Sequence, residues 1–234
     1  MSVHNIIEQN LLVMYNKLAL GTSSVCAKCK EINGSLSNPV GCWLVGNKFQ
    51  QQKKKILFVG KNARGYFDEP TGEKVFDDGR DLWNNGWAYW SYTAEVVMNI
   101  FGEDSPEYIA FTNIVKCNNS PDIDTTSNSM KEYCILKMRT LYNEIGIIKP
   151  THIIFYTGKD YDDFIPNIFD EYTIVHDGIK PVGKRNMPWR EAAARIDNFK
   201  FHVLRIWHPE RKKKDGYVSA ICDWINRNDS IHSI

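Results

Sequence analysis

The chain has 234 residues, a formal net charge of +1 and an apolar fraction of 43%. These values allow one α/β domain with a sizeable core, and we expect a single domain over residues 1–234. The near-neutral charge excludes an overall basic field as the sign of a nucleic-acid partner, although basic runs occur at 53–55 and 211–214. No signal peptide and no apolar run of about 18 residues are present, so we expect a cytoplasmic monomer without a membrane partner.

Strand and helix patterns alternate along the chain. In order, the sequence predicts a helix over 3–19, strands at 41–46 and 55–60, a helix over 80–101, a strand at 108–116, a helix over 130–147, a strand at 151–158, a helix over 159–169, strands at 172–175 and 199–207, and a helix over 215–228. This alternation predicts an α/β sandwich with a mostly parallel sheet.

The stretch from Ala110 to Cys117 covers the end of a predicted strand and contains two chemically unusual residues. Asn113 offers an amide donor and acceptor within an apolar run, and Cys117 follows the strand's end. Two other polar loops, 60–65 and 207–211, also follow predicted strands. Because open parallel sheets bind ligands at the carboxyl ends of their strands, we expect these three loops to converge.

The cysteine spacing suggests a metal site. Cys26 and Cys29 are separated by two residues in a predicted loop, and Cys117 and Cys134 follow later. Four thiolates would suit either tetrahedral zinc or a [4Fe–4S] cluster. Spacing alone does not rank this interpretation above a chance CxxC with Cys134 as a core residue of its helix. Two further cysteines have the surroundings of small core residues, and these are Cys42 and Cys222.

Taken together, the motifs resemble the uracil-DNA glycosylase superfamily, and most closely its iron–sulfur-containing fourth family. The resemblance covers nearly the whole chain, and its most specific part is the run Thr112–Cys117. The other matching segments, in family order, are Cys26-x-x-Cys29, Ile56–Gly60, Thr71-Gly72 with Phe76, Cys134, Ile148–Ile154 with Gly158, and His208-Pro209 with Arg211.

The resemblance implies a three-layer α/β/α sandwich around a four-stranded, mostly parallel sheet. It also implies an enzyme that flips uracil or a related deaminated base out of DNA and cleaves its N-glycosidic bond. Asn113 would bind the edge of the base beside Gly60, Phe76 would stack on the flipped ring, and His208 would stabilise charge on the departing base. The chemical step would need no cofactor.

The resemblance further implies contacts to DNA and a structural metal cluster. The expected DNA-contacting residues are Lys61, Arg64, Arg211 and Lys212. The expected ligands of a [4Fe–4S] cluster are Cys26, Cys29, Cys117 and Cys134.

The first active-site loop departs from the family pattern. Lys61 occupies the place of an acidic residue, so a carboxylate that activates water is missing there. Asn62 instead resembles the water-positioning asparagine of the mismatch-specific glycosylases, although a turn residue would suit the same place. Asp68 could supply a substitute carboxylate. After His208-Pro209, Glu210 stands where the family has a small residue.

These departures leave alternatives open. A catalytically inactive member of the fold could bind nucleic acid or a nucleotide. A metal-stabilised protein whose edge loops dock a protein partner is a third interpretation.

Overall fold

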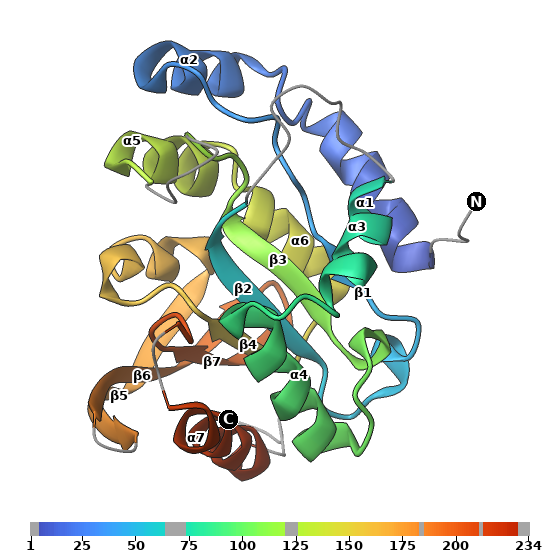
Figure 1. Ribbon diagram of the computed structural model, residues 1–234. Helices are drawn as coiled ribbons and strands as arrows, with labels where there is room; N and C mark the ends of the chain where they lie inside the picture. Colours follow the sequence, from blue (N-terminus) through green and yellow to red (C-terminus); the bar gives the residue numbers. More distant parts are fainter. Residues whose placement is uncertain (1–4, 64–73, 120–125, 183–184, 211–212, 229–234) are drawn as a thin grey trace.

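The computed structural model describes residues 5–63, 74–119, 126–182, 185–210 and 213–228 (Figure 1). Its strands form one mixed sheet in the order β1-β3-β2-β4-β7-β6-β5. The strands are β1 (Leu44–Val45), β2 (Ile56–Asn62), β3 (Ala110–Val115), β4 (His152–Phe155), β5 (Glu171–Val182), β6 (Arg185–Ile196) and β7 (Phe199–Arg205).

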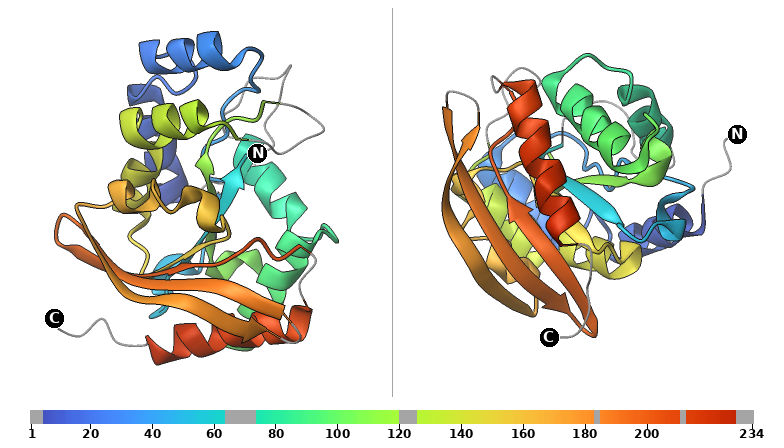
Figure 2. Two further views of the ribbon diagram at one scale, coloured as in Figure 1. Left: turned by 90° about the vertical axis from the view of Figure 1, so that its left-hand side faces the viewer. Right: turned by 90° about the horizontal axis from the view of Figure 1, so that it is seen from below.

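Helices cover both faces of this sheet, and α7 packs across one of them (Figure 2). The α-helices are α1 (Ile6–Lys17), α2 (Ser24–Asn33), α3 (Lys74–Leu82), α4 (Ala88–Phe101), α5 (Asn128–Lys131), α6 (Thr140–Ile148) and α7 (Lys214–Arg227). The shorter turns are the 3-10 helices η1 (Phe49–Gln51), η2 (Pro106–Tyr108), η4 (Lys159–Tyr161) and η5 (Ile165–Ile168), and the π-helical turn η3 (Glu132–Lys137).

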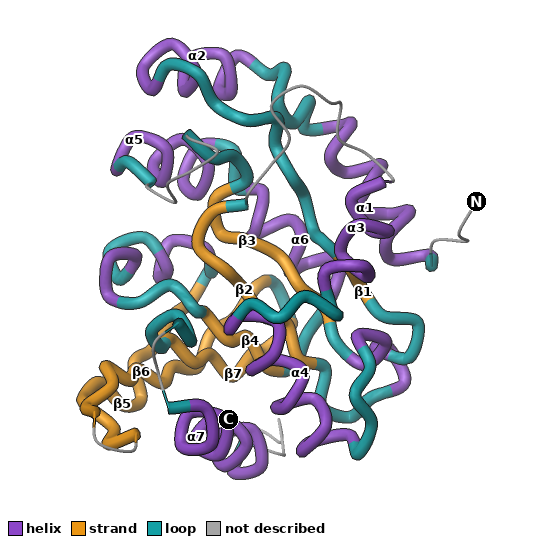
Figure 3. Tube along the Cα trace, viewed as in Figure 1, coloured by secondary structure: helices purple, strands orange, loops and turns teal. Residues whose placement is uncertain are grey.

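The predicted four-stranded sheet is wrong in its strand count. The four central strands β3, β2, β4 and β7 are parallel, but antiparallel β1 adds to one edge and β6 and β5 add to the other. Figure 3 shows β5 and β6 together at one end of the sheet. The sequence did not indicate β6, because Pro188 and the alanine run 192–194 disfavour a strand. Pairing with β5 and β7 overrides that local preference.

The central strands divide their side chains between two cores. Along β2, Leu57 and Val59 face one apolar cluster with α1 and α6, while Ile56 and Phe58 face the other with α4 and α7. Successive strand residues point to opposite faces, so a sheet buried on both sides needs a continuous apolar run. The run at 55–60 predicted this strand correctly.

Four local predictions required correction. The predicted helix over 80–101 is two helices, because residues 83–87 between α3 and α4 are not helical and α3 already begins at Lys74. The segment with Cys26 and Cys29 is not a loop, because Ser23 caps α2 by accepting a hydrogen bond from the Cys26 N–H at 3.2 Å. The predicted helix over 130–147 is broken at Arg139, which has a left-handed φ of 53°. The predicted helix over 159–169 is reduced to η4 and η5, with Pro166 in the second turn.

Across the described ranges, none of the helices combines the length and apolar character that a membrane crossing would require.

Candidate functional site

A cleft of about 910 Å³ opens where the central parallel strands end. Five of the predicted site residues line it, and these are Gly60, Lys61, Asn62, Asn113 and His208. They come from β2, from β3 and from the segment after β7. The expected convergence of the three loops is therefore confirmed for their described residues.

Asn113 is held in one orientation beside Gly60. Its Oδ1 accepts a hydrogen bond from Trp43 Nε1 at 2.6 Å, and its Nδ2 donates to the Asn62 carbonyl oxygen at 3.3 Å. The side chain is only 6% exposed. Gly60 lies opposite Asn113 in the β2–β3 register, and a Cβ on Gly60 would approach Asn113 Nδ2 to 2.4 Å. A glycine is therefore required at this position for the amide to lie where it does.

Asn62 is anchored through one end of its amide. Its Nδ2 donates to Asn118 Oδ1 at 2.9 Å, and the side chain is buried. Within the described part of the chain no donor is bonded to Asn62 Oδ1, so this acceptor is available to a ligand or a water molecule in the cleft. This geometry favours a polar binding role over that of a simple turn residue, because Asn62 belongs to β2.

His208 presents a defined ring nitrogen. The Glu210 N–H donates to His208 Nδ1 at 3.3 Å, which makes Nδ1 the acceptor and leaves the proton of the neutral ring on Nε2. The ring lies 5.5 Å from the ring of Tyr89, measured between centroids. The imidazole is half-buried, and in its neutral form the N–H is at Nε2.

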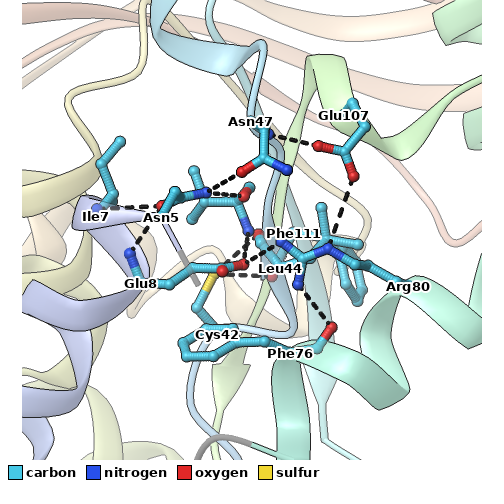
Figure 4. Close-up of polar contacts among 11 residues, drawn as sticks. Asn5, Ile7, Glu8, Cys42, Leu44, Asn47, Phe76, Arg80, Glu107 and Phe111 are labelled. Atoms are coloured by element: carbon cyan, nitrogen blue, oxygen red, sulfur yellow. Dashed lines mark hydrogen bonds and ion pairs between the residues drawn. The ribbon is translucent and has the colours of Figure 1, made fainter. Parts of the chain in front are cut away.

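Phe76 does not line the cleft, so its predicted stacking role has no support in this arrangement. Its side chain is 1% exposed and belongs to the core cluster around α1 and α6. Figure 4 shows why α3 is held there: Arg80 donates to the Phe76 carbonyl oxygen at 3.0 Å and to Glu8 Oε1 at 2.9 Å. Glu8 in turn accepts from the Val45 N–H at 3.0 Å, which ties α1, α3 and β1 together.

Five aromatic residues that the sequence did not assign to the site line the cleft, and these are Trp43, Trp87, Tyr89, Trp90 and Phe111. Tyr89 is buried and contacts His208, whereas Trp87 is 51% exposed at the start of α4. The aromatic-rich stretch suggested only packing against the sheet, which Trp83 and Trp90 confirm by their burial. No periodic signal distinguishes the cleft-lining Trp87, Tyr89 and Trp90 from their core neighbour Trp83.

Part of the predicted site lies outside the described residues. These positions are Arg64, Asp68, Arg211 and Lys212. Among the described residues of the cleft lining, the carboxylates are those of Asp78, Asp81 and Glu210.

A buried ion pair lies on the opposite face of β3 from Asn113. Lys116 Nζ donates to Glu144 Oε2 at 2.7 Å, to Thr112 Oγ1 at 2.7 Å and to the Asn113 carbonyl oxygen at 2.5 Å. Glu144 Oε1 accepts from Tyr15 Oη at 2.7 Å. All three ammonium protons of Lys116 therefore have acceptors, which is what a fully buried lysine requires. The pair fixes the backbone between Asn113 and Cys117.

The four cysteines of the predicted cluster line a second pocket, which lies beside the C-terminal end of β3. Cys26 and Cys29 come from α2, Cys117 follows β3, and Cys134 lies in η3. Apolar side chains make up most of the remaining wall, together with Lys30 and Lys116. In the described ranges no three His, Cys, Asp or Glu side chains are arranged to hold a single metal ion. The pocket nevertheless brings together all four predicted ligands.

Hydrogen-bond donors surround these sulfur atoms. The N–H groups of Gly21 and Lys116 donate to Cys26 Sγ at 3.3 Å and to Cys134 Sγ at 3.4 Å. Burial raises the pKa of Cys134 to about 12, while the charge of Lys116 opposes that shift. Burial also raises the pKa of Cys117. Without a metal the thiols of Cys117 and Cys134 are therefore neutral at physiological pH.

Comparison of the sequence with known protein families finds no matching family, and no curated protein matches it either. Function is therefore inferred from the geometry of the site.

Proposed function

We propose that this protein is a DNA base-excision glycosylase that flips out uracil or a related deaminated base and hydrolyses its N-glycosidic bond. The observation that supports the proposal most is that Asn62, Asn113 and His208 line one cleft at the ends of the parallel strands. Each of them has a polar atom held in a defined orientation. The cleft supplies the contacts that offset the cost of unstacking a base, about a few kcal/mol.

Binding of the base would depend on Asn113. One hydrogen of its Nδ2 and one lone pair of its Oδ1 are engaged within the protein, which leaves one donor and one acceptor for the base. Tyr89 and Trp87 supply aromatic surface in the same cleft, in place of the predicted Phe76. A planar base that enters the cleft would meet the amide at its edge.

In hydrolysis the bond between the sugar C1′ and the base nitrogen breaks, and its electron pair leaves with the base. His208 Nε2–H would donate to the base carbonyl oxygen that carries the developing charge. Asn62 Oδ1 would orient the water whose oxygen bonds to C1′, with its proton released to solvent. An amide orients water but does not take its proton, so the reaction depends on stabilising the departing base.

We also propose that Cys26, Cys29, Cys117 and Cys134 hold a [4Fe–4S] cluster. The donor set fits this group, because four thiols share one pocket with N–H donors to sulfur and two lysines that offset thiolate charge. When bound, the cluster would supply structural cross-linking between α2, β3 and η3. Iron and sulfide analysis of anaerobically purified protein tests this, with zinc content as the competing result.

Release of free base from a labelled single-stranded oligonucleotide with one uracil tests the enzyme proposal. The wild-type protein should release uracil, and Asn113→Ala should reduce release by about tenfold or more, since each good pair of base contacts is worth about 1–3 kcal/mol. Asn99→Ala is the matched control, because Asn99 is an exposed asparagine of α4 outside the cleft. No release from uracil, hypoxanthine, xanthine or mismatch substrates would refute the activity.

A catalytically inactive base-binding protein is the second candidate. The observation that favours it is the charge of the cleft. Asp78, Asp81 and Glu210 line it together with Lys61, and no described carboxylate directly follows Gly60. Such a protein would bind uracil-containing oligonucleotides but release no base from them.

A further inference from the structure

Trp43 makes the shortest polar contact to the amide of Asn113. Trp43 lies one residue before β1, and its backbone N–H donates to the Phe111 carbonyl oxygen at 2.8 Å. Its indole is 6% exposed, and its Nε1 donates to Asn113 Oδ1 at 2.6 Å. On the other side of Trp43, a Cβ on Gly79 would approach the Trp43 carbonyl oxygen to 2.1 Å, so α3 is packed tightly against it. The backbone of Trp43 is therefore fixed by β3 and α3 together, and its indole is buried beside Asn113.

The two partners of Asn113 have opposite polarity. An indole N–H can only donate and a backbone carbonyl oxygen can only accept, so Oδ1 must face Trp43 and Nδ2 must face Asn62. Rotating the amide by half a turn would place Nδ2 against the indole N–H and Oδ1 against the carbonyl oxygen. Both hydrogen bonds would be lost. In their place a donor would face a donor and an acceptor would face an acceptor within a buried site.

A fixed amide distinguishes between base edges. With Oδ1 and Nδ2 locked, the remaining acceptor can take a ring N–H and the remaining donor can bind an adjacent carbonyl oxygen. Uracil presents this N–H and C=O pair, whereas cytosine presents a ring nitrogen acceptor beside an amino donor. The opposite order of groups on cytosine would require the rotated amide.

We propose that Trp43 is a positioning residue that makes the cleft select the ring N–H and carbonyl edge of uracil over the amino edge of cytosine. This inference rests on the proposed base-binding function of the cleft. It does not require that the protein cleave the base.

The test measures binding of single-stranded oligonucleotides with one sugar-fluorinated deoxyuridine or one sugar-fluorinated deoxycytidine, which resist hydrolysis. The wild-type protein should prefer the uracil oligonucleotide, and Trp43→Phe should lower this preference by about tenfold, corresponding to about 1.4 kcal/mol. Trp83→Phe is the matched control: Trp83 is also 6% exposed, donates from Nε1 to Asp104 at 2.9 Å and does not line the cleft. It should keep the wild-type preference.

A second variant separates loss of the indole N–H from the change in packing that Trp43→Phe also causes. Replacement of Trp43 by benzothienylalanine keeps the shape of the indole and puts sulfur in place of the N–H. It should lower the uracil preference as Trp43→Phe does.

The proposal is overturned if wild-type protein binds both oligonucleotides equally, or if the benzothienylalanine protein keeps the full preference. Uracil release is assayed in parallel on an unmodified oligonucleotide. A protein that prefers uracil but releases none refutes the glycosylase activity while leaving the role of Trp43 supported.

Discussion

The cleft at Asn113 and the pocket at Cys117 lie four residues apart on one segment, yet they differ in chemistry. The cleft is lined by amides, an imidazole, carboxylates and aromatic rings, and neighbouring groups orient the amides and the imidazole. The pocket is lined by four thiols and mostly apolar side chains. The cleft is therefore suited to a polar ligand that enters and leaves, and the pocket to a group that stays bound.

The pleat of β3 explains how neighbouring residues of one strand face opposite sides of the sheet. Asn113 faces the side of the sheet that carries Phe111 and α4, whereas Thr112 faces α6 and bonds to Glu144 at 2.8 Å. Lys116 joins the two sides, because it pairs with Glu144 and donates to the Asn113 carbonyl oxygen. We therefore expect that the cysteine pocket can be disturbed without changing base preference in the cleft. The buried pair of Lys116 and Glu144 supports both the cleft and the pocket.

Loss of one cysteine should produce the largest effect and should be confined to the pocket. Cys134→Ser removes one of four proposed ligands, so we expect iron and sulfide to be lost from the purified protein, with the visible absorbance. Cys222→Ser is the control, since Cys222 is a buried cysteine of α7 outside the pocket, and it should keep the cluster. Full iron content in Cys134→Ser would contradict the ligand assignment.

Breaking the buried pair should destabilise the whole segment. Lys116→Met leaves the Glu144 carboxylate buried without its cation, and we expect the free energy of unfolding to fall by about 3–5 kcal/mol in urea titrations. Lys116→Met combined with Glu144→Gln should recover part of this loss, because no charge then remains buried.

The matched control for this pair is Lys28→Met. Lys28 and Glu31 form an exposed ion pair at 2.9 Å, and its loss should lower stability by less than about 1 kcal/mol. Equal effects of Lys116→Met and Lys28→Met would show that the buried pair does not support the segment.

Removing the proposed donor should affect catalysis and leave the pocket intact. His208→Ala should slow uracil release by about 10²–10³-fold, the usual cost of one lost donor to a developing charge. His176→Ala, in exposed β5, should keep the wild-type rate. Unchanged release by His208→Ala would remove His208 from the mechanism, and the iron content of both variants should match the wild-type protein.

The smallest effect is expected from Tyr89→Phe. The Tyr89 hydroxyl is buried and has no hydrogen-bond partner among the described residues, so its removal should change the free energy of unfolding by no more than about 0.5 kcal/mol. Tyr15→Phe is the contrast, because Tyr15 Oη donates to Glu144 and accepts from the Cys42 N–H at 2.7 Å. It should cost about 1–3 kcal/mol by thermal or urea unfolding.

The local sequence pattern predicted an element correctly where the packing around that element requires the same pattern. The apolar runs that became β2, β3 and β4 predicted buried strands, and the polar residues at their ends predicted the cleft lining of Asn62 and Asn113. The pattern failed at β6, where alanines and a proline form a strand only because two partners hydrogen-bond to it. It also failed at Phe76, since an aromatic side chain suits a core and a stacking site equally well.

The sequence by itself determined the central strands β2, β3 and β4 and the amides that line the cleft at the ends of two of them, because each depends on residue type and spacing. Only the tertiary structure decided which side chains contact Asn113 and Lys116. A tryptophan from the segment before β1 fixes the amide of Asn113, and a glutamate from α6 neutralises Lys116. Both contacts join residues at least 28 positions apart. No local periodicity can report such pairs, because their position depends on how the layers pack around β3.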